Sequence, residues 1–495
     1  MFPPEQVEPA RLRALRESLE RLGFTVPRIC ERAHCATIYD FQTMLRGRQA
    51  GTTLDDGLDA LIRLFMDGAA LPRETAEPLL TPALVRELEA IELIGPTETP
   101  KGPALSARAL LYPTEGLFIA SDLEFDAAVP DGRPDRVYPA ITKSCEVHLT
   151  MVPARATGDF LELCSGTGIA ALRAARTARH AWAVDITARS TTFARFNARL
   201  NGLDNVTALQ GDLFEPVAGL QFDGITAHPP YVPAFEQREI YRDGGSDGEQ
   251  ISRRIFAEAR SHLKPGGRLY CTCVLTDREQ PLEERVRAML GPDGADCDVL
   301  AIVSKADDPA EYLSKQVVGH IFDFEEANRF RAFFESLKVK AFAGVTVVIE
   351  RHARARSPVT VRRDQGPVLA PINVDSILRW KGYPSEPEAL RQLARIRPRL
   401  ANGAHMDAVH LPRDGQWVLQ RVRVAVDGPL PAAIDASPEA SMFLAWCDGR
   451  STVQELRERL VAEGAAGPDA PLERFAELIR LLLTAGILES EAPPE

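Results

Sequence analysis

The segment Leu161-Glu162-Leu163-Cys164-Ser165-Gly166-Thr167-Gly168 decides the fold of this 495-residue chain. Its first half belongs to the mostly apolar run Asp159–Cys164, which predicts a buried strand, and its second half is a turn of small residues. The turn opens a predicted helix over Ile169–His180. Because glycine lets the backbone approach a ligand closely, the segment predicts a strand, turn and helix with a ligand site at the end of the strand.

The residues that follow continue this alternation of strands and helices. Further strands are expected over Ala181–Ile186, Val206–Gln210, Phe222–Ala227, Arg268–Val274, Asp298–Val303 and Phe342–Glu350. Helices are expected between them over Ala188–Asn201, Gly248–Leu263, Leu282–Leu290 and Pro309–Leu337. Strands and helices that alternate in this way indicate a doubly wound, mainly parallel sheet. We therefore expect residues 141–353 to form a Rossmann-like α/β core of seven strands.

The rest of the chain divides into three segments. Residues 1–140 are predicted to hold helices followed by two short strands, Ala107–Leu111 and Leu117–Ser121, which is a winged-helix-like plan. Residues 354–430 contain Arg- and Pro-rich pieces, and we expect a linker or a small accessory unit there. Residues 431–495 are expected to form a second winged-helix-like module. The core would then be flanked by α+β domains.

Charge and hydropathy exclude several classes of protein. The formal net charge of −12 argues against broad electrostatic binding to nucleic acid or to anionic membranes. From Asp55 to Ile94 the chain has nine acidic residues and only three arginines, the opposite of what a DNA-reading winged helix needs. The apolar runs are shorter than the ~20 residues of a membrane span, and residues 1–5 lack a signal-peptide pattern. A cytoplasmic location is expected.

Three other strand ends carry side chains that suit a nucleoside. Asp185 ends the second predicted strand, where a carboxylate can accept hydrogen bonds from two ribose hydroxyls. Asp212 and Leu213 follow the third strand, where the carboxylate can accept from an adenine amino group while the apolar side chain covers the ring. The fourth strand ends in His228-Pro229-Pro230-Tyr231. All of these lie at the carboxyl ends of strands, where open α/β sheets bind ligands.

This order of motifs resembles that of class I S-adenosylmethionine-dependent methyltransferases, over roughly residues 141–353. A dinucleotide dehydrogenase would usually carry a Gly-x-Gly-x-x-Gly turn, which is absent, and would not need the tetrapeptide. The resemblance implies S-adenosylmethionine as cofactor. The cofactor-binding residues that it implies are Glu162, Cys164, Gly166, Gly168, Asp185, Ile186, Asp212, Leu213 and His228.

The tetrapeptide resembles the Asn/Asp-Pro-Pro-Tyr/Phe loop of enzymes that methylate amino or amide nitrogens. The later segment Tyr241-Arg242-Asp243-Gly244-Gly245-x-x-Gly248 is similar to the one that follows this loop in protein-glutamine methyltransferases of the release-factor type. In that family the first loop residue and the next carbonyl accept hydrogen bonds from the target nitrogen. The resemblance therefore implies catalytic roles for His228, Pro229 and Tyr231, and substrate-binding roles for Pro230, Tyr241 and Asp243.

The first residue of this loop is His228, where the family has asparagine or aspartate. A neutral imidazole can accept one hydrogen bond, and near its ordinary pKa of ~6.5 it can also act as a general base. The histidine therefore admits methylation of oxygen, carbon or other nitrogens besides amides. Alternatives without a ligand are a strand-end role for His228, packing for Tyr231 and turn formation for Asp243. For His148 a solvated or core position is expected, and entry into the substrate pocket is the alternative.

The sequence thus predicts a methyltransferase whose acceptor is a protein or peptide amide or amine, or a natural-product hydroxyl. The last segment resembles winged-helix domains of the peptide-chaperone type that accompany peptide-modifying enzymes, which implies a peptide or carrier-bound substrate. Packing or formation of a homodimer is an equally open use of that segment. Two other functions stay open: methylation of nucleic-acid amino groups, and cofactor sensing without catalysis. No metal-binding cluster is recognised, and no metal is expected.

Overall fold

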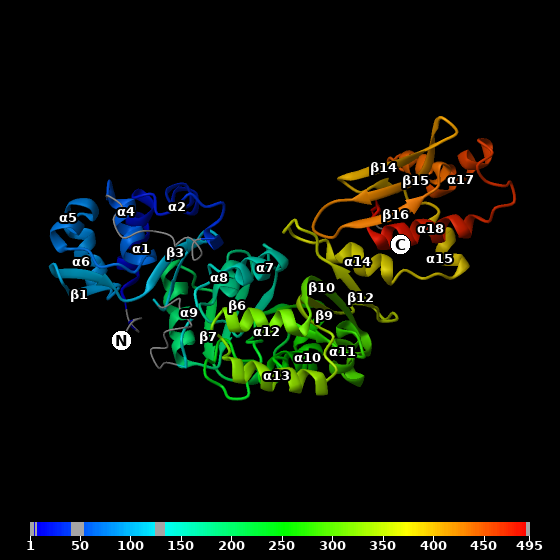
Figure 1. The fold of residues 1–495 in the computed structure, drawn as a ribbon. Coiled ribbons are helices and arrows are strands. Elements are labelled where there is room, and N and C mark those ends of the chain that lie inside the picture. Colours follow the sequence, from blue (N-terminus) through cyan, green and yellow to red (C-terminus); the bar gives the residue numbers. More distant parts are fainter. Residues whose placement is uncertain (1–3, 5–6, 41–53, 124–133, 492–495) are drawn as a thin grey trace. The chain divides into compact units, whose positions relative to one another are not determined.

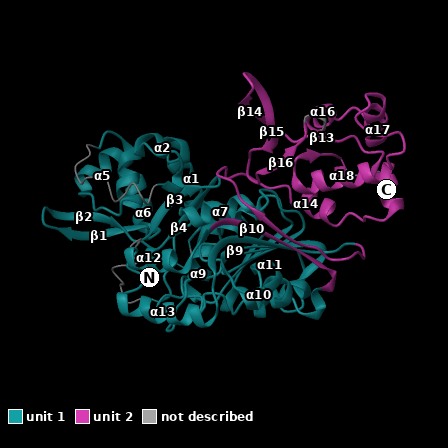
Figure 2. Ribbon diagram, turned by 45° about the vertical axis from the view of Figure 1, so that its right-hand side comes forward, with its two compact units in different colours: residues 1–294, 306–353 teal, residues 295–305, 354–495 magenta. Residues whose placement is uncertain are grey.

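The computed structural model describes residues 4, 7–40, 54–123 and 134–491, which fall into two compact units (Figure 2). The first unit holds Met1–Gly294 and Ala306–Ala353, and the second holds Ala295–Lys305 and Arg354–Glu495. Within the described ranges, no helix has the length and the apolar character that crossing a membrane requires.

The first unit is built on a mainly parallel sheet with the strand order β11-β9-β8-β5-β6-β7. Figure 1 labels β6, β7 and β9 of this sheet, together with helices that accompany it. The bounds are β5 Asp159–Leu163, β6 His180–Asp185, β7 Val206–Gln210, β8 Phe222–Ala227, β9 Leu263–Asp277 and β11 Ala341–Arg351. Strands β5 to β9 run parallel to one another, whereas β11 is antiparallel to β9. Together with β10 (Cys297–Asp307) of the second unit, these strands make up the seven that the sequence predicts. The predicted α/β class is confirmed.

The chain reverses its direction across this sheet between β5 and β8. It runs outward from β5 to β6 and β7, and then returns to place β8 on the other side of β5. Such a reversal leaves a crevice at the carboxyl ends of the two central strands, which is where ligands bind in open α/β sheets. The helices of this part of the unit are α7 Lys143–Met151, α8 Ile169–Ala175, α9 Ala188–Leu200, α10 Gln250–His262, α11 Leu282–Met289, α12 Pro309–Val318 and α13 Phe324–Ser336.

Helices and two hairpins precede the sheet. The helices are α1 Pro9–Arg21, α2 Val26–Ala33, α4 Gly57–Leu61, the π-helical turn Ile62–Met66, α5 Arg73–Leu80 and α6 Pro82–Ala90. The predicted hairpin is present with its first strand displaced by three residues: β3 is Leu110–Thr114, where Ala107–Leu111 was expected, and it pairs with β4 (Leu117–Ser121). A second hairpin, β1 (Ile94–Thr99) with β2 (Gly102–Ala107), was not predicted, because proline usually argues against a strand. Both of its strands are edges, where proline is tolerated.

One apolar core joins the N-terminal helices to the sheet. It contains Leu12 of α1 and Leu61 of α4, Ile119 of β4, and Phe193 and Phe196 of α9. All five side chains are buried. The helices at the start of the chain therefore pack in the same core as the helices that cover the sheet, and they cannot lose this packing without exposing α9.

The second unit contains most of β10 and, from residue 360 onward, further regular structure. Its elements are β10, β12 Thr360–Asp364, α14 Val374–Lys381, α15 Pro387–Leu393, β13 Arg399–Leu400, β14 Ala404–Arg413, β15 Gln416–Val426, β16 Ala432–Ala436, α16 Pro438–Trp446, α17 Val453–Ala462, α18 Leu472–Ala485 and β17 Leu488–Glu489. Trp380 and Leu393 share one apolar core with Phe443 and Ile479. The four-domain division expected from the sequence, with its winged-helix-like flanks, stays a prediction.

Candidate active site

A cavity of about 400 Å³ lies at the carboxyl ends of β5, β6, β7 and β8, at the point where the chain reverses its direction across the sheet. Its volume falls within the ~300–1,000 Å³ that is typical of small-molecule sites. The predicted site residues that line it are Glu162, Cys164, Gly166, Asp185, Ile186, Asp212, Leu213, His228, Pro229, Pro230, Tyr231 and Tyr241. Gly168 and Asp243 are not among the lining residues. The structure thus brings together the four strand ends that the sequence singles out.

The glycine-rich turn after β5 contains two glycines with different roles. Gly166 has a φ of +49°, and a Cβ placed on it would have no atom within 4 Å, so its open side faces the cavity. Gly168 has a φ of +79°, and a Cβ there would lie 2.8 Å from Leu172 Cδ1 and 3.0 Å from Ala194 Cβ. Gly166 is therefore suited to a ligand, whereas Gly168 is needed for the close packing of α8 on α9.

Two buried carboxyl groups border this turn. Glu162 accepts hydrogen bonds from the backbone N–H groups of Ala170 and Ala171 in α8, at 3.2 and 2.8 Å, while burial raises its pKa to about 8. Asp185 accepts from the backbone of Gly166 at 2.9 Å and of Thr187 at 3.0 Å. Burial also raises the pKa of Asp185. Both groups would gain from a ligand that offers positive charge or hydrogen-bond donors.

The acid at the third strand end has a cationic partner. Asp212 Oδ2 accepts a hydrogen bond from Arg254 Nη2 of α10 at 2.8 Å. Leu213, the next residue, is buried and has a φ of +50°. The ion pair holds the Asp212 side chain at the rim, and the unusual backbone of Leu213 points to a turn whose conformation the surrounding structure imposes.

The tetrapeptide after β8 places its imidazole in an aromatic cluster. The His228 ring centroid lies 5.1 Å from that of His148, with 19° between the planes, and 5.9 Å from that of Tyr231, with 27°. Nε2 of His228 is buried and has no hydrogen-bond partner among the described residues. Burial lowers the pKa of His228 to about 4, so its imidazole is neutral near pH 7.

Sequence reasoning missed the contribution of the segment before β5. Residues of 136–149 line the cavity, among them Tyr138 and His148, and the Tyr138 ring stacks on Tyr241 at 4.9 Å between centroids. His148 of α7 is buried and also lines the cavity, so the core position and the pocket position that the sequence left open are both met. No periodicity or motif marks these residues, because they precede the sheet in sequence and reach the site only through packing.

The segment Tyr241–Gly248 packs against the tetrapeptide. A Cβ on Gly244 would lie 2.7 Å from the Pro230 carbonyl oxygen, and one on Gly248 would lie 2.5 Å from that of Tyr231. Asp243 accepts hydrogen bonds from the backbone of Arg238 at 2.7 Å and of Glu239 at 2.9 Å. These contacts match the turn-forming alternative for Asp243, and its contact with substrate stays a prediction.

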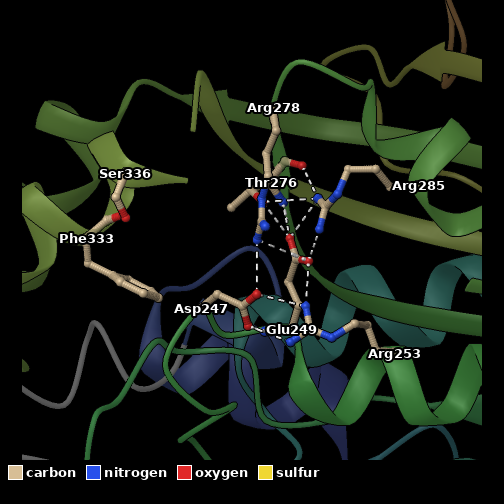
Figure 3. Close-up of polar contacts among 8 residues, drawn as sticks. All are labelled: Asp247, Glu249, Arg253, Thr276, Arg278, Arg285, Phe333 and Ser336. Carbon is tan, nitrogen blue, oxygen red and sulfur yellow. Dashed lines mark hydrogen bonds and ion pairs between the residues drawn. The ribbon is translucent and has the colours of Figure 1, made fainter. Parts of the chain in front are cut away.

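A buried ionic network follows this segment (Figure 3). Glu249 is fully buried, pairs with Arg285 and accepts the backbone N–H of Thr276 at 2.7 Å. Burial would raise the pKa of Asp247, but the hydrogen bonds and charge of Arg253 hold it at about 2. Figure 3 shows Arg253, Arg278 and Arg285 converging on these two carboxylates. The network joins the start of α10 to the end of β9 and to α11, and so supports the segment that packs on the tetrapeptide.

The residues of the cavity fit the cofactor that the sequence implies. Gly166 leaves space for a ligand beside the backbone, and two buried polar atoms, Ser165 Oγ and His228 Nε2, have no hydrogen-bond partner in the described part of the chain. Buried polar groups of this kind are rare unless a ligand or water satisfies them. The acids Glu162 and Asp185 could accept hydrogen bonds from an amine and from ribose hydroxyls, and these roles stay predictions.

Known proteins match this part of the chain. A family model described as a methyltransferase small domain matches residues 140–294. A release factor glutamine methyltransferase of Moorella thermoacetica is 30% identical over 266 residues, which cover 47% of this chain and 88% of that protein. A ribosomal protein uL3 glutamine methyltransferase of Bradyrhizobium diazoefficiens is 38% identical over 124 residues, 22% of this chain and 39% of that protein. A solved ribosomal protein L11 methylase of Lactobacillus delbrueckii is 18% identical, with a TM-score of 0.24, over 42% of this chain and 75% of that one.

Proposed function

The chain belongs to the release factor glutamine methyltransferase family, and from that premise we propose that it methylates the side-chain amide nitrogen of a glutamine in a protein. The expectation of an S-adenosylmethionine-dependent methyltransferase is confirmed by the family model and by the relatives. The observation that carries the choice of acceptor is the His-Pro-Pro-Tyr loop, which lines the same cavity as the cofactor motifs.

When bound, S-adenosylmethionine supplies a methyl group that the sulfonium already activates. The contribution of the protein is to orient the acceptor amide. We assign its two N–H groups to the Pro229 carbonyl oxygen and to Nε2 of His228, the buried atom that lacks a partner among the described residues. Two consecutive prolines stiffen the loop, so these acceptors are preorganised and the nitrogen lone pair is directed at the methyl group.

The electrostatic state of His228 favours an amide over a hydroxyl. With its pKa lowered to about 4 by burial, the imidazole is a hydrogen-bond acceptor near pH 7 but a weak base. Each of these methylations releases a proton and the thioether S-adenosylhomocysteine. A hydroxyl oxygen or an acidic carbon must lose its proton to a base to become a good nucleophile, whereas the amide mainly needs orientation, because its nitrogen becomes strongly acidic once the N–C bond forms and then gives one N–H proton to the neutral imidazole or to water. A neutral histidine can therefore replace the acceptor function of asparagine in this loop.

The two other functions are less well supported. Nucleic-acid methylation predicts a basic groove, with Arg238 and Arg242 as candidates, but Arg238 pairs with Glu326 at 3.1 Å and Arg242 with Asp243 at 2.7 Å. Both cations are thus compensated by carboxylates rather than presented to phosphate. A cofactor sensor would need the cofactor motifs but would have no use for an acceptor loop.

The test is methyl transfer by the full chain to purified release factor and ribosomal protein uL3, the substrates in the relatives' names. Tandem mass spectrometry locates the methyl group, which we expect on a glutamine. His228→Asn, which restores the family's residue, is expected to keep activity, whereas His228→Ala loses it. Methylation of another residue type contradicts the amide assignment, and cofactor binding without transfer to any protein supports a sensor.

A further inference from the structure

We propose that His148 is a positioning residue that fixes the imidazole of His228 toward the methyl acceptor. The proposal rests on the proposed function, because it concerns the residue that would hold the acceptor amide. His148 lies on α7, 80 positions before His228 in the sequence, and no motif connects the two.

The His148 ring is held at both of its nitrogens. Nδ1 lies 3.0 Å from Thr272 Oγ1 on β9, and Nε2 lies 3.1 Å from Thr226 Oγ1 on β8. Because the Thr226 hydroxyl donates to the Tyr270 carbonyl at 3.2 Å, it accepts from Nε2–H of His148, which leaves Nδ1 to accept from Thr272. Two neighbouring strands thus determine both the tautomer and the ring plane of His148.

The His228 ring is held differently. Its Nε2 has no hydrogen bond within the described residues, and the rotation of an imidazole about its Cβ–Cγ bond is only broadly restricted. The surfaces that limit this rotation are the rings stacked on it, His148 at 5.1 Å and Tyr231 at 5.9 Å. The His148 ring is the one with a plane determined by hydrogen bonds. Because β8 and β9 fix the plane of the His148 ring, they also limit the plane that the His228 ring stacked on it can take.

The charge state of His148 suits this role. Burial, and then the charges of His228 and Arg173, hold the pKa of His148 well below its ordinary value. The ring is only 3% exposed and stays neutral, so it places no like charge against His228. A neutral, hydrogen-bonded ring keeps a fixed position against His228 and does not compete with His228 for a proton.

The first experiment tests whether the fixed ring plane of His148 matters. His148→Phe keeps a ring against His228 but loses both threonine hydrogen bonds, and His148→Ala removes the ring together with its bulk. We expect His148→Ala to lower kcat by about 10- to 100-fold, the usual effect of misplacing a catalytic group, with KM for S-adenosylmethionine changed less than about 2-fold. His148→Phe is expected to recover only part of this loss, because its ring can stack on His228 but its plane is no longer fixed by Thr226 and Thr272. An unchanged kcat in His148→Ala, or the full wild-type kcat in His148→Phe, would overturn the proposal.

His262 offers a matched control. It is also a buried histidine that stacks on an aromatic ring, Phe214, at 4.2 Å between centroids, and it does not line the cavity. His262→Ala is expected to lower the midpoint of thermal unfolding but to leave kcat within about 2-fold of the wild type. If it lowers kcat as much as His148→Ala does, the effect of the latter is one of general stability and the proposal fails.

The second experiment needs no turnover. In protein labelled with ¹⁵N-histidine, two-bond ¹H–¹⁵N spectra show the ring signals of each imidazole, and the His228 signals are assigned by their loss in His228→Asn. We expect one sharp set of His228 ring signals in the wild type, and broadened or duplicated signals in His148→Ala, where no stacked histidine limits the rotation of the ring. An unchanged single set in His148→Ala contradicts the proposal. If the wild type methylates no protein, the proposed function fails while this arm still tests the effect of His148 on His228.

Discussion

The side-chain amide of Asn197 pairs with the backbone of Ala120 in both directions. Its Oδ1 accepts the Ala120 N–H at 2.8 Å, and its Nδ2 donates to the Ala120 carbonyl at 3.0 Å. The same Nδ2 donates to the carbonyl of Thr167, in the glycine-rich turn, at 3.0 Å. One fully buried side chain of α9 thus connects β4, which precedes the sheet, to the turn that lines the cavity.

We expect Asn197→Ala to impair both stability and cofactor binding. It leaves buried backbone groups of Ala120 and Thr167 without a partner, which costs about 2–4 kcal/mol of the free energy of unfolding. Urea denaturation measures this loss. Affinity for S-adenosylhomocysteine, measured by calorimetry, should also fall because the turn loses its anchor.

Asn201 is the control for this prediction. One helical turn later, its amide makes the same two-way contact with Phe118, at 2.9 and 2.7 Å, but it does not contact the glycine-rich turn. Asn201→Ala should lower the free energy of unfolding while leaving the affinity for S-adenosylhomocysteine unchanged. Equal losses of affinity in the two variants would show that β4, and not the contact to Thr167, matters for the turn.

Substitution of Gly168 should mainly lower the free energy of unfolding, whereas substitution of Gly166 should mainly weaken cofactor binding. Gly168→Ala combines a positive φ with a Cβ placed 2.8 Å from Leu172, so we expect it to lower the free energy of unfolding by more than about 2 kcal/mol. Gly166→Ala meets no protein atom and costs only the backbone strain of about 1 kcal/mol, but it adds a methyl group to a residue that lines the cavity. We therefore expect Gly166→Ala to abolish cofactor binding while the free energy of unfolding changes little. Denaturation and calorimetry on both variants separate the two effects.

Asp185→Asn should weaken cofactor binding by about 10- to 100-fold, which corresponds to one hydrogen bond to a buried charged group. The amide keeps the size of the side chain but presents one acceptor atom, and the backbone N–H groups of Gly166 and Thr187 already compete for it. Calorimetry with S-adenosylhomocysteine measures the change. Asp204→Asn, at an exposed turn away from the cavity, is the control, and wild-type affinity in Asp185→Asn would rule out the ribose role.

The stability of the protein should depend on pH through Glu162. Burial raises the pKa of this carboxyl to about 8, so the folded state holds its proton more tightly than the unfolded state does. The stabilisation is complete below the unfolded pKa of about 4.3 and is lost as the pH rises through about 8. Between about pH 5 and about pH 9 the wild type should therefore lose roughly 4 kcal/mol relative to Glu162→Gln in urea denaturation. Parallel pH profiles of the two proteins would contradict this.

Much of the fold and the cofactor side of the site was predictable because it depends on local patterns. Apolar runs separated by helical periods predict the strands, and the carboxyl ends of parallel strands meet at one edge of the sheet. Asp185, Asp212 and His228 therefore had to lie near one another. The second hairpin was not predicted, because the effect of proline depends on whether a strand is central or at an edge, which local sequence does not reveal.

The sequence by itself determined the α/β core, the glycine-rich turn and the acceptor loop, since each is encoded within a few consecutive residues. Only the tertiary structure decided that His148 stacks on His228, that Asn197 joins β4 to the turn, and that Asp243 holds a turn. The roles of His148 and Asn197 depend on partners about 80 residues away in the chain, and that of Asp243 on the path of its own loop. Packing, which no short pattern records, brings such partners together and sets their burial and charge state.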